Sequence, residues 1–194
     1  MPSKVSATKG TRLLITRFYP HTTSLFFPNR MSEFRNNSYN IQDILGYNSA
    51  WIRDAIMQSE TIQDKVTIIE CFLVRQVKAC RRDYNQFSLI DSIFKRINNN
   101  NELSRLKDLI PDHSLSHRYI QKMFREFVGL TPKLFLRIER LKSSLQLLHN
   151  RKNSLTQMAL ICGYYDQSHF IREFKEFTGM TPSQFLSRNK PVII

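Results

Sequence analysis

The chain has 194 residues, enough for one domain or two small ones with a real core. Its 29 lysines and arginines outnumber its 16 aspartates and glutamates, and the net charge of +13 favours a polyanionic partner, either nucleic acid or an acidic membrane surface. The three cysteines exclude a disulfide framework and fit no zinc site, and with no apolar leader or long apolar run we expect a soluble, cytoplasmic protein without a membrane partner.

The N-terminal part of the chain predicts a short β element followed by helices. Residues 11–20 and 24–27 are the only plausible strands, and two such runs form at most a marginal hairpin unless another element covers them. Residues 41–46 predict one short helical turn, and Asn48 is expected to cap a helix that runs through Gln58. We expect Trp51, the only tryptophan, to pack between the helices.

A longer helix is predicted to begin at Thr61 and to extend toward Tyr84. Its apolar positions recur at helical spacing and form one stripe, made of Ile62, Val66, Ile69, Leu73, Val77 and Cys80. Cations gather toward its end, where they suit the helix dipole and require no nucleic acid to explain them: Arg75, Lys78, Arg81 and Arg82.

The second half of the chain predicts helices separated by polar breaks. Helices are expected over residues 86–97 and 102–110, with an asparagine-rich loop between them. A long helix is expected from Pro132 to His149, and another covers residues 155–162 before a turn at 163–165. A helix, a tight turn and a second helix describe a helix-turn-helix, whose second helix enters the DNA major groove.

A segment of the chain occurs twice, at residues 116–136 and again at 166–186. Eight of the aligned positions are identical, which indicates a duplicated supersecondary unit. Gly129 and Gly179 predict left-handed helix caps, and the Thr-Pro pair after each glycine restarts a helix. In each copy a stripe at helical spacing is expected in the core: Ile120, Phe124 and Phe127, then Phe170, Phe174 and Phe177.

The opposite face of each copy is cationic and rich in polar side chains. The first face carries His117, Arg118, Gln121, Lys122 and Arg125, and the second carries Gln167, Ser168, Ile171, Arg172 and Lys175. A charged face is usually only solvated. Two such faces, on duplicated units of a strongly basic chain, are better explained by nucleic-acid binding.

Residues 163–182, GYYDQSHFIREFKEFTGMTP, resemble the signature of the AraC/XylS family of bacterial transcription regulators, and residues 116–132 resemble the first helix-turn-helix of that family. The likeness covers about residues 86–188. It implies a mainly α fold, a seven-helix bundle with two helix-turn-helix subdomains joined by a linker helix. We therefore expect residues 85–194 to form an AraC-type DNA-binding domain, preceded over residues 1–84 by a short β remnant and a helical bridge.

The resemblance also implies roles for individual side chains. Base-reading residues would be Arg118, Gln121 and Lys122 in the first subdomain and Gln167, Ser168 and Arg172 in the second, whereas His117, Arg125, His169 and Lys175 would contact the DNA backbone. Arginine and lysine suit guanine O6 and N7, glutamine suits adenine, and phosphate contacts set the register without reading sequence. Two positions depart from the pattern: Ile171 either meets a thymine methyl or packs, and Leu106-Lys107 stands where a leucine-alanine pair is preferred.

The N-terminal part has a weaker likeness. Residues 16–46 are similar to the end of the β-rich sensor domain of one AraC-like subgroup, in which a helical bridge follows. Because the few residues before this segment have no room for the rest of that barrel, the chain is expected to be N-terminally shortened. An effector pocket in the barrel would then be absent or incomplete.

The leading hypothesis is a sequence-specific DNA-binding regulator of transcription, with double-stranded DNA as its partner. RNA polymerase is a further candidate partner, and the N-terminal region is a candidate homodimer interface. The alternative is a truncated DNA-binding or dimerising remnant that competes with, or pairs with, an intact relative without ligand regulation. Whether residues 11–84 fold and dimerise alone would separate the two.

An enzyme is not expected from this sequence. It has no G-x-S-x-G or phosphate-loop motif, and it lacks the cysteine clusters of AraC-type units that are fused to alkyl-transfer repair domains. His113 and His117 straddle a turn, so neither a metal nor another cofactor is expected. RNA binding normally uses aromatic-faced sheets or other modules, which the sequence does not indicate.

Overall fold

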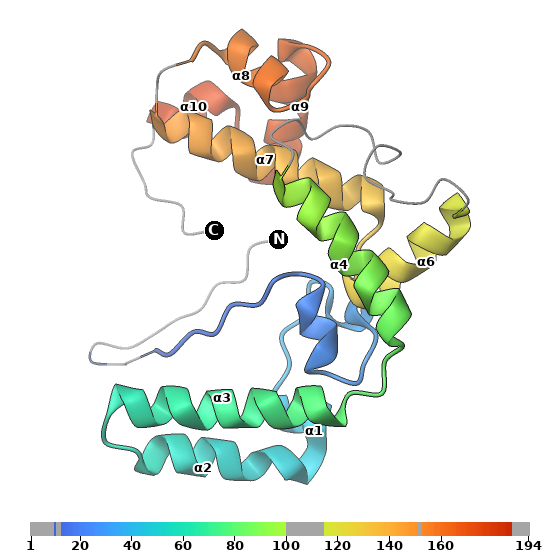
Figure 1. Cartoon of the computed structure of the whole chain (residues 1–194). Helices are drawn as coiled ribbons and strands as arrows, with labels where there is room; N and C mark the ends of the chain where they lie inside the picture. Colours follow the sequence, from blue (N-terminus) through green and yellow to red (C-terminus); the bar gives the residue numbers. More distant parts are fainter. Residues whose placement is uncertain (1–9, 11–12, 100–114, 151–152, 188–194) are drawn as a thin grey trace. The chain divides into compact units, whose positions relative to one another are not determined.

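The computed structural model describes residues 10, 13–99, 115–150 and 153–187. These residues are mainly helical, and none of them lies in a β-strand, so the predicted α fold is confirmed (Figure 1). The chain forms two compact units, Met1–Phe94 with Leu115–Thr131, and Lys95–Ser114 with Pro132–Ile194. The first unit holds residues 116–131 of the first copy of the duplicated segment, and the second unit holds the remaining residues of that copy together with the whole second copy. The helix predicted at 102–110 lies outside the described residues.

The first unit begins with short turns and continues with helices. Its elements are the 3₁₀ turns η1 (Thr22–Leu25), η2 (Met31–Phe34) and η3 (Gly46–Ser49), and the helices α1 (Ile41–Leu45), α2 (Ala50–Gln58), α3 (Ile62–Ala79), most of α4 (Tyr84–Asn99) and α6 (His117–Phe127). Helices α2 and α3 lie side by side as a hairpin (Figure 1). The turns η1 and η2 contact α6, so N-terminal residues support the helix that belongs to the first copy of the duplicated segment.

The strands predicted at 11–20 and 24–27 are wrong for the residues that the structure describes. The hydroxyls of Thr22 and Thr23 both donate hydrogen bonds to the carbonyl of Tyr19, at 3.0 and 3.3 Å, and this closes a turn instead of extending the chain. Phe18 packs on Phe26 with ring centroids 4.8 Å apart. The phenylalanines of this run therefore pack locally and are half-buried, and a hairpin too short to be stable alone does not form.

The two helices predicted for this region, one through Gln58 and one from Thr61, are confirmed with shifted ends. Helix α2 starts at Ala50, and its N-cap is Ser49 and not Asn48, because the 3₁₀ turn η3 precedes it. Helix α3 begins after its Thr61 cap but ends at Ala79, where Cys80 turns to extended backbone. Arg81 and Arg82 therefore lie beyond the helix, and the dipole explanation for them is wrong.

The apolar stripe predicted for α3 is only partly buried. Two of its residues, Ile62 and Val77, are exposed, whereas Phe72, which lies outside the predicted stripe, is the buried residue of α3. Trp51 is partly exposed at the surface of the hairpin, and the Arg75 guanidinium lies over its ring at 5.3 Å. The tryptophan therefore packs against a cation and is not enclosed between helices.

The core of the first unit joins α4 to α6. Ile120 and Phe124 on α6 are fully buried, as is Ile90 on α4, and the rings of Phe94 and Phe124 stack at 6.1 Å. The buried imidazole of His21 lies 4.1 Å from the Phe94 ring centroid, which ties the N-terminal turns to α4. The apolar stripe predicted for the first copy is confirmed.

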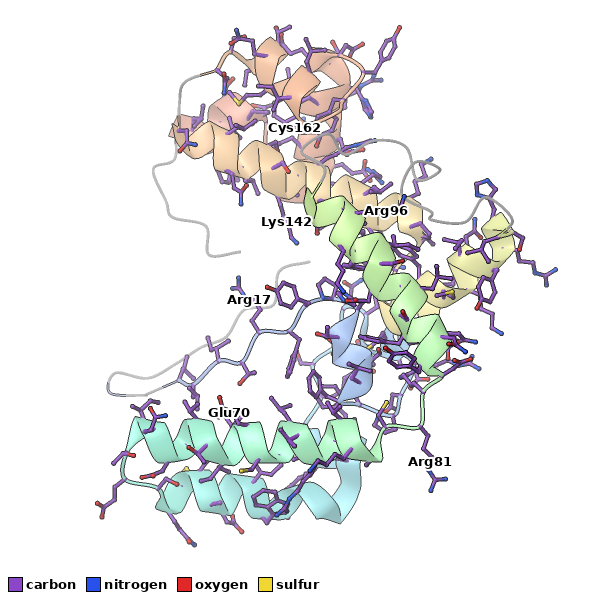
Figure 2. The ribbon with its side chains drawn as sticks, viewed as in Figure 1. Arg17, Glu70, Arg81, Arg96, Lys142 and Cys162 are labelled. Carbon is purple, nitrogen blue, oxygen red and sulfur yellow. The ribbon has the colours of Figure 1, made fainter. Side chains whose placement is uncertain are left out.

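The second unit comprises α7 (Pro132–Asn150), α8 (Leu155–Ile161), α9 (Gln167–Thr178) and α10 (Pro182–Ser187). Helix α7, predicted as the linker helix, is roughly 28 Å long at 1.5 Å per residue. Its C-terminal half packs with α8 and α9 around a buried cluster of Leu145, Leu148, Met158, Ala159, Cys162, Tyr164, Phe170 and Phe174. Cys162 lies inside this cluster (Figure 2), where burial raises the pKa of its thiol to about 11.

Candidate nucleic-acid interface

Helix α6 presents the first predicted reading face. Its N-terminus is fixed by Ser116, whose hydroxyl accepts a hydrogen bond from the Tyr119 amide at 3.2 Å, and its end is followed by Gly129 in the left-handed region at φ 80°. Because Phe124 and Phe127 are buried on one side, the other side faces solvent. All five predicted contact residues of this helix are exposed: His117, Arg118, Gln121, Lys122 and Arg125.

The cations of this face have no acidic partner among the residues that the structure describes. Arg118, Lys122 and Arg125 form no side-chain hydrogen bond or ion pair with another residue that the structure describes. Unpaired arginines and lysines on one ridge attract a polyanion more strongly than paired ones, because no neighbouring carboxylate offsets their charge. The first copy therefore has the electrostatic character of a phosphate-binding surface.

Helix α9 presents the second predicted face in the same way. The side chain of Asp166 caps it by accepting from the His169 amide at 2.6 Å, and Gly179 ends it at φ 78°. Phe170 and Phe174 are fully buried. Ser168, Arg172 and Lys175 are exposed on the opposite side, whereas Gln167, His169 and Ile171 are half-buried.

Two of the half-buried residues contact the preceding turn and helix. The Gln167 carboxamide oxygen accepts a hydrogen bond from the Thr156 hydroxyl of α8 at 2.7 Å. His169 accepts through Nδ1 from the Tyr165 amide at 3.4 Å, and its Nε2 lies 3.7 Å from Glu173 Oε2. These contacts fix the start of α9 against α8, which is the geometry of a helix-turn-helix.

Each recognition helix is held from behind by an arginine that the sequence did not single out for this role. Arg137 of α7 pairs with Glu173 and Glu176, and its guanidinium lies 4.9 Å from the Phe177 ring. Burial lowers the pKa of Arg137, but the hydrogen bonds to the two carboxylates outweigh this effect and leave its pKa raised.

Arg82 takes the equivalent place in the first copy. Its Nη1 lies 3.5 Å from Glu126 Oε1 and its guanidinium 5.4 Å from the Phe127 ring, positions that align with Glu176 and Phe177 in the repeat. Its neighbour Arg81 is exposed and projects away from the ribbon (Figure 2). Nothing local in the sequence distinguishes the two arginines, since the partners of Arg82 are distant along the chain.

A cleft of about 650 Å³ beside α9 extends the cationic surface onto α7. Lys133, Arg140 and Arg172 form no ion pair with another described residue and contribute positive charge to the cleft, whereas Arg137 pairs with Glu173 and Glu176. The Nε of Arg140 is buried and has no hydrogen-bond partner among the described residues. No group of three histidine, cysteine or acidic side chains in the described ranges could hold a metal ion.

The comparisons with known proteins identify this part of the chain. Residues 113–188 match the family described as helix-turn-helix domain. The transcriptional activator RhaR of Mannheimia succiniciproducens is 27% identical over 131 residues, which are 67% of this chain and 46% of that protein. The Msm operon regulatory protein of Streptococcus mutans is 33% identical over 81 residues, 42% of this chain and 29% of that protein. The chain carries a helix-turn-helix domain of the AraC/XylS family.

The AraC/XylS family consists of DNA-binding transcriptional regulators and not of enzymes, as the sequence predicted. The chain spans less than half the length of these two relatives. A solved DNA-binding transcriptional dual regulator from Escherichia coli K-12 is 28% identical, covers 51% of this chain and 95% of its own, and superposes with a TM-score of 0.44. No helix in the described part of the chain is long and apolar enough to cross a membrane.

Proposed function

We propose that this chain is a sequence-specific, DNA-binding regulator of transcription that reads two adjacent major-groove segments, one with α6 and one with α9. The observation that carries the proposal is the same in both copies. A capped helix buries its phenylalanines on one side and exposes unneutralised arginine and lysine on the other. An α-helix fits the major groove, and such side chains match its acceptor pattern.

The base-reading residues in this proposal are Arg118, Gln121, Lys122, Gln167, Ser168 and Arg172. Four of these side chains form no side-chain hydrogen bond with another described residue. The Gln167 oxygen accepts a hydrogen bond from Thr156, and Arg172 donates only to the Ser168 carbonyl of its own helix, at 3.3 Å. The side-chain NH2 group of Gln167 can still donate a hydrogen bond to a base, so Gln167 stays among the base-reading residues. His117, Arg125, His169 and Lys175 would contact phosphates and set the register.

Two further partners belong to the proposal. RNA polymerase would be the partner of a regulator that activates, and a second copy of the chain would pair through the N-terminal region. The apolar side chains of Met57, Ile62 and Val74, exposed on α2 and α3, support the second partner. A regulator of this class acts on bacterial DNA, so we propose a cytoplasmic location, with residues 85–194 as the DNA-binding domain.

The experiment that tests the proposed function is selection of bound duplexes from a random pool by the full chain. Two helices reading successive major grooves should enrich two short motifs about 10 base pairs apart, which is one helical turn. Binding without any enriched motif would reduce the function to non-specific association, and no binding would refute the proposal.

A further inference from the structure

The N-terminal turn η2 borders the reading face of α6. A cleft of about 710 Å³ in the first unit is lined on one side by Arg30 and Ser32 and on the other by Arg118, Lys122, Arg125 and Glu126 of α6. Arg30 lies more than 80 positions before α6 in the sequence and outside residues 113–188, which match the helix-turn-helix domain. The reading face of the first copy is therefore composite.

Arg82 makes three contacts that join the residues before η2 to α6. Arg82 donates from Nε to the Ser24 carbonyl and from Nη2 to the Asn29 carbonyl, both at 2.7 Å, while its Nη1 faces Glu126 of α6. One guanidinium thus joins the segment before Arg30 to the recognition helix.

Met31 supplies a second point of attachment. Its side chain is buried, and its carbonyl oxygen lies so close to Gly129 that a Cβ at that glycine would be only 2.5 Å away. The residues on either side of Arg30 are consequently held, and the position of Arg30 beside α6 follows from backbone contacts and not from its own side chain.

The charges around the cleft favour an anion. Arg30 is exposed and, like Arg118, Lys122 and Arg125, forms no side-chain hydrogen bond or ion pair with another described residue. The one carboxylate of the cleft, Glu126, is neutralised by Arg82. Four cations therefore surround a polar concave surface, which is the arrangement that binds phosphate oxygens.

We propose that Arg30 binds a phosphate of the DNA backbone next to the segment read by α6, and that residues 24–34 contribute to DNA binding by the first unit because they place Arg30 beside α6. The inference rests on the proposed function and extends it to residues outside the matched domain. Because the guanidinium borders the helix but is not on it, Arg30 positions the helix along the groove and does not select bases.

The test is the salt dependence of binding to a selected duplex and to a scrambled one, for the full chain and three variants. Loss of one phosphate contact lowers the slope of log K against log salt by about 0.9, so the affinity ratio of wild type to Arg30→Ala should be about 3.5-fold larger at about 50 mM than at about 200 mM salt. The loss should be equal on both duplexes. Arg30→Lys should restore most of the slope, since it keeps the charge.

Arg53→Ala is the matched control, because Arg53 is an exposed arginine of α2 in the same unit and its removal changes the net charge equally. It should leave the slope as in wild type. If Arg30→Ala and Arg53→Ala have the same slope while wild type binds, the role of Arg30 is overturned and the proposed function stands. If wild type binds neither duplex, the proposed function itself fails.

Discussion

Arg137 of α7 donates a hydrogen bond from Nε to Glu173 Oε2 of α9 across 2.8 Å, and only 7% of the glutamate side chain is exposed. The carboxylate lies next to Arg172 in sequence but on the buried side of α9. The ion pair therefore fixes how α9 is rotated on α7 and which side chains it presents. In the first copy the aligned residue is Met123, which is also buried but is apolar.

Removal of Arg137 should destabilise the second unit strongly. Arg137→Ala leaves Glu173 buried without its cation, which we expect to cost about 3–5 kcal/mol in the free energy of unfolding measured with urea. Lys142→Ala, which breaks the more exposed pair with Glu139, should cost less than about 1 kcal/mol. Adding Glu173→Met, which copies Met123, should recover much of the loss. If Arg137→Ala and Lys142→Ala lowered the free energy of unfolding equally, the Arg137–Glu173 pair would not behave as a buried ion pair.

The two cap glycines form a matched pair for a second prediction. Both have left-handed backbone, but a Cβ at Gly179 would meet nothing within 4 Å, whereas one at Gly129 would lie 2.5 Å from the Met31 carbonyl. Gly179→Ala should cost about 1–2 kcal/mol from backbone strain alone. Gly129→Ala should cost at least about 1 kcal/mol more, because the turn carrying Met31 must shift. Similar unfolding free energies for the two variants would contradict the close approach of that turn.

The duplicated segment was predictable because its signals are local. The caps at Ser116 and Asp166, the glycines after each helix and the phenylalanine stripes all act within a few turns of chain, so the sequence determines them directly. The exception is Phe177, which is only half-buried and is covered by Arg137.

The sequence did not reveal what depends on distant contacts. The run around Phe26 has the composition of a strand, but a strand needs partners, and the local hydrogen bonds to Tyr19 formed a turn instead. In the same way Arg82 belongs to a basic cluster whose other members are exposed, and only the fold shows that it meets Ser24 and Glu126. The N-terminal support of α6 was therefore missed.

The buried thiol of Cys162 should make stability fall at high pH. Its pKa is raised from 9.0 to about 11, so the unfolded chain loses this proton at lower pH than the folded chain. Stability from this group is complete below about pH 9 and is lost as the pH rises toward 11, by at most about 2–3 kcal/mol. Cys162→Ala should flatten the decline of unfolding free energy between pH 9 and 10. If the unfolding free energy of Cys162→Ala fell as steeply with pH as that of wild type, titratable groups other than Cys162 would cause the decline.

Alanine substitutions at Arg172 and Lys175 should affect DNA binding differently, the first through sequence discrimination and the second through overall affinity. Arg172→Ala should cost roughly 1–3 kcal/mol of binding free energy on the selected duplex and relax discrimination there, because a base contact is lost. Lys175→Ala should weaken binding to selected and scrambled duplexes alike, because a phosphate contact is lost. Titration of both duplexes with both variants separates the two roles. Equal losses on both duplexes for Arg172→Ala would remove it from the base-reading set.

The most direct test of two-helix recognition combines protein variants with altered half-sites. Lys122→Ala on α6 and Arg172→Ala on α9 are titrated against the selected duplex and against duplexes in which one or the other half-site is scrambled. Each variant should lose discrimination at one half-site only, and the two variants should differ in which half-site that is. If both substitutions relaxed the same half-site, or neither relaxed any, two-segment reading by α6 and α9 would be contradicted.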